Sequence, residues 1–460
     1  MTIAPADLRV AIIGSGPSGF YAAEALQKAA AGVRIDLFDR LPTPFGLVRG
    51  GVAPDHPKIK SVTRVFDRVA TQPGFRFFGH VVVGEDITIA ELLEHYDAVI
   101  LAVGAQSDRQ LGIPGEQLEG SHAATELVGW YNGHPDYVDR QFDLTQREAA
   151  VIGLGNVAMD VTRILAKSAD ALATTDLAAH ALTALRDARL EVIHVIGRRG
   201  PVQAACTTPE LRELGELDGV DVMVDPRDLE LDITSREHLA SVDDRTAEKN
   251  LDILRHWAER GDTGAPRKIV FHFNASPVEL LGERRVTGLR MVRNTLEPDG
   301  QGGVRASATD EFRTLPVGLV FRSVGYRGVA LVDAPFDAHR GVIPNVAGRV
   351  VESVDSATAI HGLYVCGWIK RGPQGVIGTN KSDAVETVDL LIADAATGKL
   401  GTGSQTTALV DELLARRGVR VTDWSDWQRL DQEEQARGAP AGRPREKLTS
   451  VEEMLDMLGR

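Results

Sequence analysis

Two glycine-rich segments have the residue types and spacing that bind the phosphates of a dinucleotide. The pattern G-x-G-x-x-G/A occurs at Gly14, Gly16 and Gly19 and again at Gly153, Gly155 and Ala158. The first glycine of such a pattern allows a tight turn, the second lets the backbone approach a pyrophosphate, and the third position keeps a helix close to its strand. Either pattern alone could be an ordinary turn between a strand and a helix. Together they predict a chain that holds two nucleotides and transfers electrons between them.

The residues after the next strand distinguish the two nucleotides. Asp39 follows the strand-like run VRIDLF, where its carboxylate can accept hydrogen bonds from the ribose hydroxyls of FAD or NAD. The corresponding run EVIHVIG is followed by Arg198 and Arg199, with no acid. Two guanidiniums there would bind a 2′-phosphate through charge-assisted hydrogen bonds, so the second nucleotide is predicted to be NADP(H). The alternative is a solvated pair of surface arginines.

The elements that position these residues alternate between strands and helices. An apolar, strand-like run precedes each glycine pattern, and the helix-compatible segments YAAEALQKAA and MDVTRILAKSAD follow. A further strand is expected over residues 97–105, and turn residues near Pro114 and over 322–328 predict two crossovers between domains. The predicted fold class is therefore α/β with two Rossmann-like nucleotide-binding domains, the second inserted into the first. We place the first part of the FAD-binding domain at residues 1–108, the inserted NADP-binding domain at 109–324, the completion of the FAD-binding domain at 325–400 and a C-terminal extension at 401–460.

Two segments add little to this scheme. The residues ALATTDLAAHALTALRD predict a helical insertion before the strand at 190–197. The extension begins with a linker rich in Gly, Ser and Thr, and its later segment GAPAGRPREKL is rich in Pro, Gly and Arg. That composition predicts a solvated surface strand or loop.

Composition and charge narrow the classes of partner. The chain has 460 residues, of which 43% are hydrophobic and 25% charged, and it has no apolar run of transmembrane length. The opening residues MTIAPADL are too few and too mixed for a targeting peptide, so we expect a cytoplasmic protein without a membrane partner. A net charge of −14 argues against nucleic acid as a partner. An acidic protein partner would need a local basic patch.

The two cysteines, Cys206 and Cys366, narrow the chemistry. They form no CxxC dithiol, and the sequence has no cluster with the spacing of metal or iron–sulfur ligands, so no metal site is expected. A flavoenzyme that reduces disulfides would need such a dithiol. We therefore expect both cysteines to be buried apolar residues and the electrons to leave for another kind of acceptor.

Longer motifs carry a more specific signal. The segments SGPSGFYAAEAL, LPTPFGLVRGGVAPDHPKIK, GLGNVAMDVTRIL, VIGRRGPVQAACTTPELREL and GWIKRGPQGVIGTNK occur in this order. They resemble the adrenodoxin reductase family, in particular its bacterial NADPH:ferredoxin reductase branch, from residue 9 to about residue 390. The resemblance implies a two-domain flavoprotein of the glutathione-reductase-like fold, with noncovalent FAD and with NADPH as hydride donor. Its enzyme class would be ferredoxin–NADP(+) reductase.

The resemblance also implies which residues contact the cofactors. The implied FAD contacts are Gly14, Gly16, Pro17, Gly19, Asp39, Leu47, Val83, Trp368, Gly375, Val376 and Ile377. The implied NADP contacts are Arg109, Leu154, Gly155, Asn156, Val157, Arg198, Arg199, Glu210 and Gly375. This chain departs from the family at two of them, because Asp39 is Glu in many relatives and Leu154 is polar in some. Neither departure changes the cofactor assignment, and neither predicts how tightly FAD or NADP binds.

The loop GPQGVIGTN is expected to lie against the flavin. Gly372 and Gly375 permit a close backbone approach, and a helix that begins after the loop would direct N–H groups at the pyrimidine edge. Trp368, at the preceding strand end, could pack on the isoalloxazine or donate a hydrogen bond, or it could fill a domain interface.

Three titratable residues are candidates for supporting the reaction. His56 lies in the rigid loop PDHPKIK and could relay a proton or orient a group near the flavin, with Asp160 and Glu210 as carboxylate partners. The alternatives are a histidine bonded to its local backbone and, for Asp160, a first-turn helix acid.

The resemblance implies that the electron acceptor is a ferredoxin-type iron–sulfur protein. A flavin suits that acceptor because it takes two electrons together and can release them singly. The alternatives are an NADPH diaphorase or quinone reductase and a low-turnover nucleotide-dependent redox sensor. Ferredoxins are typically acidic, so a docking surface would be basic. The candidate cations are Arg255, Arg260, Arg267, Lys268, Arg284, Arg285, Lys370 and Arg371.

Overall fold

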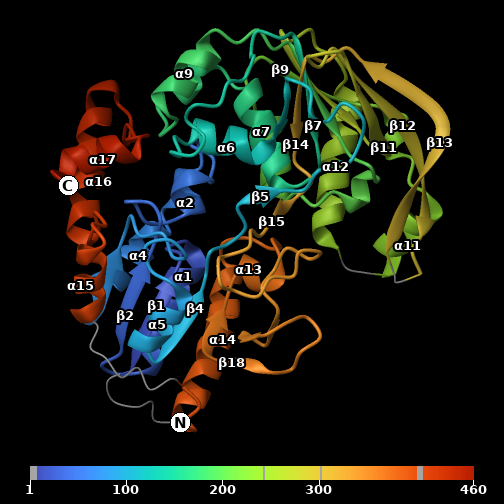
Figure 1. The fold of residues 1–460 in the computed structure, drawn as a ribbon. Coiled ribbons are helices and arrows are strands. Elements are labelled where there is room, and N and C mark those ends of the chain that lie inside the picture. The colour runs from blue at the N-terminus through green and yellow to red at the C-terminus, as the bar shows by residue number, and fades with distance from the viewer. Residues whose placement is uncertain (1–7, 242–243, 301–302, 401–407) are drawn as a thin grey trace. The chain divides into compact units, whose positions relative to one another are not determined.

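The computed structural model describes residues 8–241, 244–300, 303–400 and 408–460, and the chain forms two compact units (Figure 1). The first unit comprises Met1–Ser107, Asn132–Val138 and Gly325–Arg460, and the second comprises Asp108–Tyr131 and Asp139–Val324. The second unit is thus inserted in sequence between parts of the first. The short segment Asn132–Val138 belongs to the first unit, a detail that the boundaries drawn from the sequence do not contain. None of the helices in the described ranges is both long and apolar enough to cross a membrane.

A seven-stranded sheet forms the centre of the first unit, in the order β16-β17-β18-β4-β1-β2-β3. Its strands are β1 (Arg9–Ile13), β2 (Arg34–Phe38), β3 (Phe75–Phe78), β4 (Ala98–Leu101), β16 (Asn345–Val346), β17 (Arg349–Val351) and β18 (Ala359–Val365). The five strands from β18 to β3 are parallel, whereas β16 and β17 are antiparallel. The strands β1 and β4 read as continuous apolar runs because helices cover both faces of a parallel sheet.

Helices cover both faces of this sheet. On one face α1 (Pro17–Ala29) packs against α14 (Thr379–Ala396), with Leu26 and Val388 in the same apolar core as Ile12. On the other face α5 (Ile89–His95) and α15 (Ala408–Arg416) contribute to the core around Leu101. The short helices α2 (Leu47–Gly50), α3 (Pro57–Lys60) and α4 (Thr63–Ala70) follow the loop after β2.

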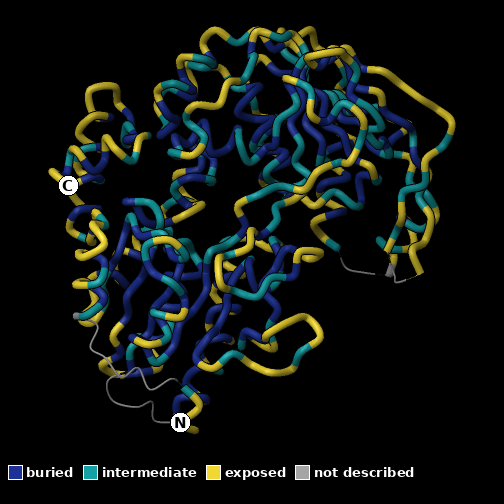
Figure 2. Tube along the Cα trace, in the orientation of Figure 1, coloured by how far each residue is buried: buried dark blue, intermediate teal, exposed yellow. Residues whose placement is uncertain are grey.

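The second unit contains a parallel six-stranded sheet in the order β6-β14-β7-β8-β10-β9. Its strands are β6 (Ser121–Ala123), β7 (Glu148–Ile152), β8 (Val192–Ile196), β9 (Val220–Val224), β10 (Arg267–His272) and β14 (Leu319–Arg322). An antiparallel sheet of β11 (Ala275–Leu281), β12 (Gly288–Pro298) and β13 (Val304–Leu315) shares its core. Most of β13 is exposed, as Figure 2 shows, whereas the central strands of both units are buried.

The helices of the second unit include α6 (Ala124–Tyr131), α7 (Asn156–Ala166), α10 (Thr208–Leu214) and α12 (Arg245–Arg260). The helix predicted over MDVTRILAKSAD is interrupted, because Lys167 is extended and the Ser168 side chain caps α8 (Ala169–Leu172). With α9 (Ala179–Arg186), α8 forms the predicted helical insertion before β8. The two longest of these helices, α7 and α12, pack against strands of the parallel sheet.

The C-terminal extension belongs to the first unit, where α16 (Trp424–Gly438) and α17 (Val451–Leu458) follow α15 (Figure 1). The prediction that GAPAGRPREKL is a solvated loop holds for residues 439–442 and for Pro444, which are exposed. It is wrong for Arg443, Lys447 and Leu448, which are 8%, 7% and 1% exposed. Composition alone does not predict this burial, because the cations of the segment have acidic and amide hydrogen-bond partners elsewhere in the unit. The predicted linker at 401–407 lies outside the described residues.

Candidate nucleotide-binding sites

The first glycine pattern forms an open turn between β1 and α1. Gly14 has a φ of 104°, and a Cβ there would lie 2.6 Å from the Ala102 carbonyl oxygen. A Cβ at Gly19 would lie 2.0 Å from the Gly14 oxygen, so both positions require glycine in this turn. Gly16 differs, because a Cβ there would meet no atom within 4 Å. The space beside Gly16 and the uncapped start of α1 together suit the approach of a pyrophosphate.

Asp39 follows β2 directly, as the sequence predicts. Its Oδ2 accepts hydrogen bonds from the Ser15 backbone N–H at 3.0 Å and from the Ser15 hydroxyl at 2.5 Å. The Leu41 N–H donates to Oδ1 at 3.0 Å. These bonds fix the carboxylate beside the glycine turn, and since an ionised carboxylate can accept about four hydrogen bonds, it retains capacity for a ribose hydroxyl. A small cavity beside it is lined by Asp39, Leu41, Thr43, Pro44, Gly46, Arg49, Gly50, Asn132, Gly133, His134, Pro135 and Met454.

The loop after β18 contains the predicted flavin contacts. Trp368 begins α13 (Trp368–Arg371), and its indole Nε1 is buried without a hydrogen-bond partner in the described part of the chain. Gly375 has a φ of 80°, Val376 is 55% exposed, and α14 then begins without a side-chain cap. An unsatisfied buried donor, an exposed loop and an uncapped helix start fit a planar group with carbonyl oxygens and ring nitrogens. These residues therefore fit FAD.

The other predicted FAD contacts differ in exposure. Leu47 is 37% exposed at the start of α2, whereas Val83 is 7% exposed and packs in the core that contains Leu101. Because the Val83 side chain packs in the core, any contact of this residue with FAD would be made by its backbone. Pro17 occupies the first turn of α1, where its missing N–H costs no helix bond.

The second glycine pattern has the same construction in the second unit. Gly153 has a φ of 137°, and a Cβ there would lie 2.2 Å from the Ser323 carbonyl oxygen. A Cβ at Gly155 would meet nothing within 4 Å, and α7 begins there without a side-chain cap. The Asn156 Oδ1 accepts a hydrogen bond from the Thr207 N–H at 2.8 Å, which ties this turn to the start of α10. Both glycine turns therefore present an open, uncapped helix N-terminus.

Arg198 and Arg199 follow β8 as predicted, and neither has an acidic partner among the described residues. Burial and the neighbouring Arg198 charge both lower the pKa of Arg199. Their backbone is held in place, because the Arg198 oxygen accepts from Asn294 at 2.8 Å and the Arg199 oxygen accepts from the Asn274 N–H at 3.0 Å. Two adjacent guanidiniums without a counter-charge on a fixed backbone fit a 2′-phosphate. Arg198 is exposed, as is Arg109, another predicted NADP contact, whereas Arg199 is half-buried.

Asp160 and Glu210 are joined by a residue that the sequence did not single out. Arg163 is 1% exposed, and its guanidinium binds Asp160 at 2.8 Å and Glu210 at 3.1 Å. Glu213, one turn further along α10, binds the same guanidinium at 3.1 Å. The spacing of Asp160 and Arg163 on α7 was a visible signal, but the partner on α10 was not. Because His56 lies in the first unit, its pairing with these acids stays a prediction.

Both cysteines are buried free thiols, which confirms the prediction from their sequence context. Burial raises the pKa of Cys206 to about 11 and raises that of Cys366 still further. Cys206 belongs to the second unit and Cys366 to the first. Such thiols remain protonated at neutral pH and are poor nucleophiles.

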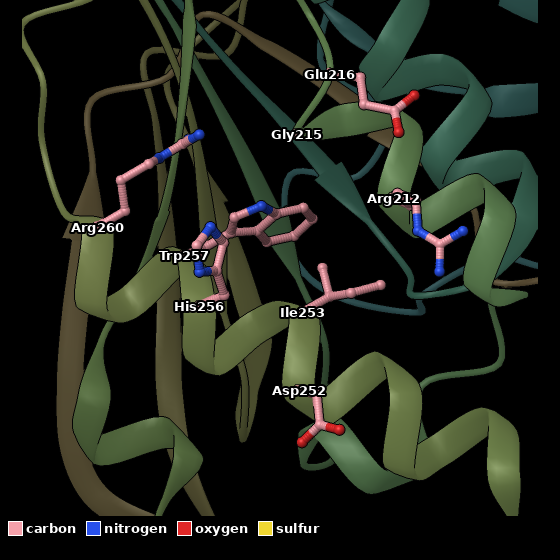
Figure 3. Close-up of a pocket in the computed structure, with 8 residues that line it drawn as sticks. All are labelled: Arg212, Gly215, Glu216, Asp252, Ile253, His256, Trp257 and Arg260. Carbon is pink, nitrogen blue, oxygen red and sulfur yellow. The ribbon is translucent and has the colours of Figure 1, made fainter.

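A separate cavity of about 340 Å³ lies between α10 and α12 (Figure 3). Its wall includes Trp257, whose indole lies so close to Gly215 that a Cβ there would be 2.6 Å from Nε1. Charged side chains of both signs surround it, among them Arg212, Glu216 and Arg260. Since no residue of the second glycine pattern lines it, this cavity is distinct from the predicted NADP site.

Comparisons with known proteins identify the class of protein to which this chain belongs. Residues 8–223 match the family model of pyridine nucleotide-disulphide oxidoreductases, so the fold is of that class. The chain is 50% identical over 457 residues to the NADPH-ferredoxin reductase FprA of Mycobacterium tuberculosis, with 97% of this chain and 98% of the relative covered. It is 42% identical to the mitochondrial NADPH:adrenodoxin oxidoreductase of Arabidopsis thaliana, with 97% and 95% covered. The solved structure of M. tuberculosis FprA in complex with NADPH superposes with a TM-score of 0.91 at 49% identity, covering 98% of this chain and 99% of that one.

The chain therefore belongs to the adrenodoxin reductase family, in its bacterial NADPH:ferredoxin reductase branch. This result confirms the predicted family and the predicted fold class.

Proposed function

We propose that this chain is an NADPH-dependent FAD flavoenzyme that passes single electrons to a ferredoxin-type iron–sulfur protein. The observation that carries the proposal is the pair of open, uncapped helix N-termini at Gly16 and Gly155. One is followed by an acid, Asp39, and the other by two arginines without acidic partners, so the two units are suited to different nucleotides. The full-length relatives named NADPH-ferredoxin reductase support this assignment.

The first unit would hold FAD through residues of three loops. The backbone at Gly16 and the first turn of α1 would donate to the pyrophosphate, and Asp39 would accept from a ribose hydroxyl. Trp368 would bring its unsatisfied indole N–H to the isoalloxazine end. When bound, FAD supplies the chemistry that converts a two-electron donor into a source of single electrons.

The second unit would bind and orient NADPH. Gly155 and the start of α7 would face the pyrophosphate, and the Arg198 and Arg199 guanidiniums would bind the 2′-phosphate. Hydride transfer needs contact and orientation more than acid–base catalysis, so the chain's main contribution is to hold the donor in place. Arg163 holds Asp160 and Glu210 in a fixed arrangement, and both acids remain candidates for a supporting role beside His56.

The acceptor would dock on exposed cations. Most of the candidate cations predicted from the sequence already bind acidic side chains or backbone carbonyls. Within the described residues, ion pairs engage Arg255, Lys268, Arg285, Lys370 and Arg371, and Arg267 donates to backbone carbonyls. Arg260 and Arg284 remain exposed without an acidic partner in those ranges. The first unit also exposes Lys58 on α3 and Arg64 and Arg68 on α4, none with an acidic partner among the described residues. We infer that this α3–α4 surface, defined as Lys58, Arg64 and Arg68, receives an acidic ferredoxin.

Stopped-flow reduction of purified ferredoxins by the NADPH-reduced protein tests the proposal. A second-order ferredoxin reduction that falls with ionic strength supports it. NADPH-driven reduction of ferricyanide or of a quinone without any ferredoxin reduction would instead indicate a diaphorase or quinone reductase. Binding of both nucleotides without turnover would indicate a redox sensor. A cytoplasmic location and the absence of nucleic acid and membrane partners stay predictions from the sequence.

A further inference from the structure

A buried cluster of charges joins the C-terminal helices to the loop after β2, all within the first unit. Glu434 of α16 is 0% exposed. Both of its carboxylate oxygens accept hydrogen bonds from the Arg49 guanidinium, one of them at 2.8 Å. Arg49 belongs to α2, at the end of residues 41–51, which we name loop 41–51. A contact between positions 385 residues apart thus links the extension to the nucleotide-binding part of the unit.

The extension supplies further partners that complete this cluster. The Arg445 guanidinium donates to Glu434 at 3.2 Å and to Asp431 at 2.5 Å, and the Leu448 N–H donates to Glu434 at 3.0 Å. Burial by itself raises the pKa of Glu434, but the charges of Arg49 and Arg445 hold it below its ordinary value. A fully buried carboxylate with two guanidiniums and a backbone donor is ionised and held in one orientation.

Loop 41–51 contacts the extension near its start, in its middle and near its end. Near its start the Thr422 hydroxyl donates to the Pro42 oxygen at 3.2 Å. In its middle the Phe45 ring packs edge-on against Trp427 at 5.4 Å. At its end the Trp427 ring lies 5.3 Å from the Arg49 guanidinium carbon, and Lys447 donates to the Arg49 oxygen at 3.3 Å.

The opposite side of loop 41–51 lies on the first glycine turn. The Phe45 N–H donates to the Ser15 oxygen at 3.0 Å. Gly46 has a φ of 47°, and a Cβ there would lie 2.9 Å from the Gly16 Cα. A shift of the loop therefore moves a wall of the space beside Gly16, where the pyrophosphate would lie. Met454 of α17 lines the same cavity as Asp39, so the extension also reaches the ribose end.

We propose that Glu434 is a positioning residue for the flavin: through Arg49 it holds loop 41–51 against Gly16 and so slows the release of FAD. The inference rests on the proposed function, which places FAD at the first glycine pattern. Glu434 itself does not line the cavity beside Asp39, and its carboxylate is satisfied by Arg49, Arg445 and the Leu448 N–H. The C-terminal extension is accordingly part of the flavin-binding machinery and not an appendage.

The test is Glu434→Gln in the full-length holoprotein, because the amide keeps the shape and removes the charge. FAD release is followed after dilution by the rise in free-flavin fluorescence, and the flavin absorbance bands report the environment of the bound ring. We expect release to become about tenfold faster or more. The matched control is Asp426→Asn, also on α16 and 3% exposed, whose bonds go to Asp423 and Arg460. It should lower the thermal midpoint and leave FAD release unchanged.

A double-mutant cycle tests whether Glu434 acts through Arg49. Arg49→Gln alone should speed release as Glu434→Gln does, and the double variant should be no faster than the Arg49→Gln variant. Additive effects, wild-type release from Glu434→Gln, or equal acceleration by Asp426→Asn would each overturn the inference.

Should Glu434→Gln not fold, Lys447→Gln takes its place, since Lys447 bonds to the Arg49 backbone oxygen. The same acceleration of release supports the inference, and unchanged release overturns it. A wild-type protein that binds no FAD would contradict the proposed function itself, a result that none of the variants can mimic.

Discussion

Gly16 and Gly155 are the residues at which binding and folding can be separated. Gly14, Gly19 and Gly153 are required by the fold, because a Cβ at each would lie within 2.6 Å of a carbonyl oxygen. Gly16 and Gly155 face open space, so a side chain there leaves the turn intact. If a substitution at Gly16 or Gly155 abolishes nucleotide binding, the loss can therefore be attributed to the binding site and not to misfolding.

We predict that Gly16→Val yields a folded protein that purifies colourless or with greatly reduced flavin absorbance. The branched side chain would occupy the space into which the pyrophosphate must come, beside the first turn of α1. Gly155→Val is the reciprocal control, since it should retain the yellow flavin and lose NADPH-dependent ferricyanide reduction. A fully yellow Gly16→Val protein would show that the first glycine pattern does not bind FAD.

The preference for NADPH over NADH should depend on Arg198 and Arg199. Replacing both by Gln is expected to raise the KM for NADPH far more than that for NADH, because each lost charge-assisted hydrogen bond is worth about 1.5–3 kcal/mol. Steady-state ferricyanide reduction with each coenzyme measures the ratio. Arg255→Gln with Arg260→Gln removes the same charge from the same unit and should leave the ratio unchanged. Retention of the NADPH preference in the first double variant would contradict the assignment.

Three strands of the second unit are linked by polar side chains, of which two, His194 and His272, are buried and the third, Glu148, is half-buried. His194 Nδ1 of β8 lies 3.0 Å from His272 Nε2 of β10, and His194 Nε2 lies 2.9 Å from Glu148 of β7. Burial lowers the pKa of His272 to about 3, and the His194 and Arg313 charges lower it as well. Burial also lowers the pKa of His194, although Glu148 opposes that shift.

This pair should make the second unit sensitive to acid. The pKa of His272 is lower in the folded than in the unfolded chain, where it is about 6.5, so below that pH the unfolded chain binds a proton that the folded chain excludes. The contribution of His272 to the free energy of unfolding is therefore fully present above pH 6.5 and is lost as the pH falls toward 3. At pH 5 the loss from this group alone is about 2 kcal/mol. Thermal unfolding between pH 7 and 5 measures the loss. His272→Gln should flatten the dependence, and His361→Gln, at an exposed site, should not.

The elements also show which features the sequence could predict. Asp39 and Arg198 were predictable because each follows a strand that succeeds a glycine pattern, and local order along the chain determines that place. The pairing of Arg163 with Glu210 and of Arg49 with Glu434 was not, since these partners lie 47 and 385 residues away and only the packed fold brings them together. For the same reason a segment rich in Pro, Gly and Arg was predicted to be solvated although Lys447 is buried with Asn132 as its partner.

At the scale of the whole molecule, charge sets the conditions for meeting a protein partner. A net charge of −14 repels an acidic ferredoxin, so productive encounter requires a local basic surface. Arg64 and Arg68 stand one turn apart on α4, exposed and without acidic partners in the described ranges, and Lys58 lies on the preceding short helix. The α3–α4 surface therefore offers steering charges that are not neutralised locally.

We predict that Arg64→Glu with Arg68→Glu slows ferredoxin reduction and flattens its dependence on ionic strength. Exposed charges steer over a Debye length of about 8–10 Å at physiological salt, so removing the attraction removes the part of the rate that salt can screen. Ferricyanide reduction by NADPH should stay nearly unchanged, because that small acceptor needs no protein docking surface. Arg260→Glu with Arg284→Glu provides the comparison on the second unit, with the same change in charge. If only this second pair slows the reaction, docking involves the second unit and the α3–α4 assignment is wrong. If neither pair changes the rate or its salt dependence, charge steering by these cations does not govern the encounter, and the inference of an acidic ferredoxin at this surface fails.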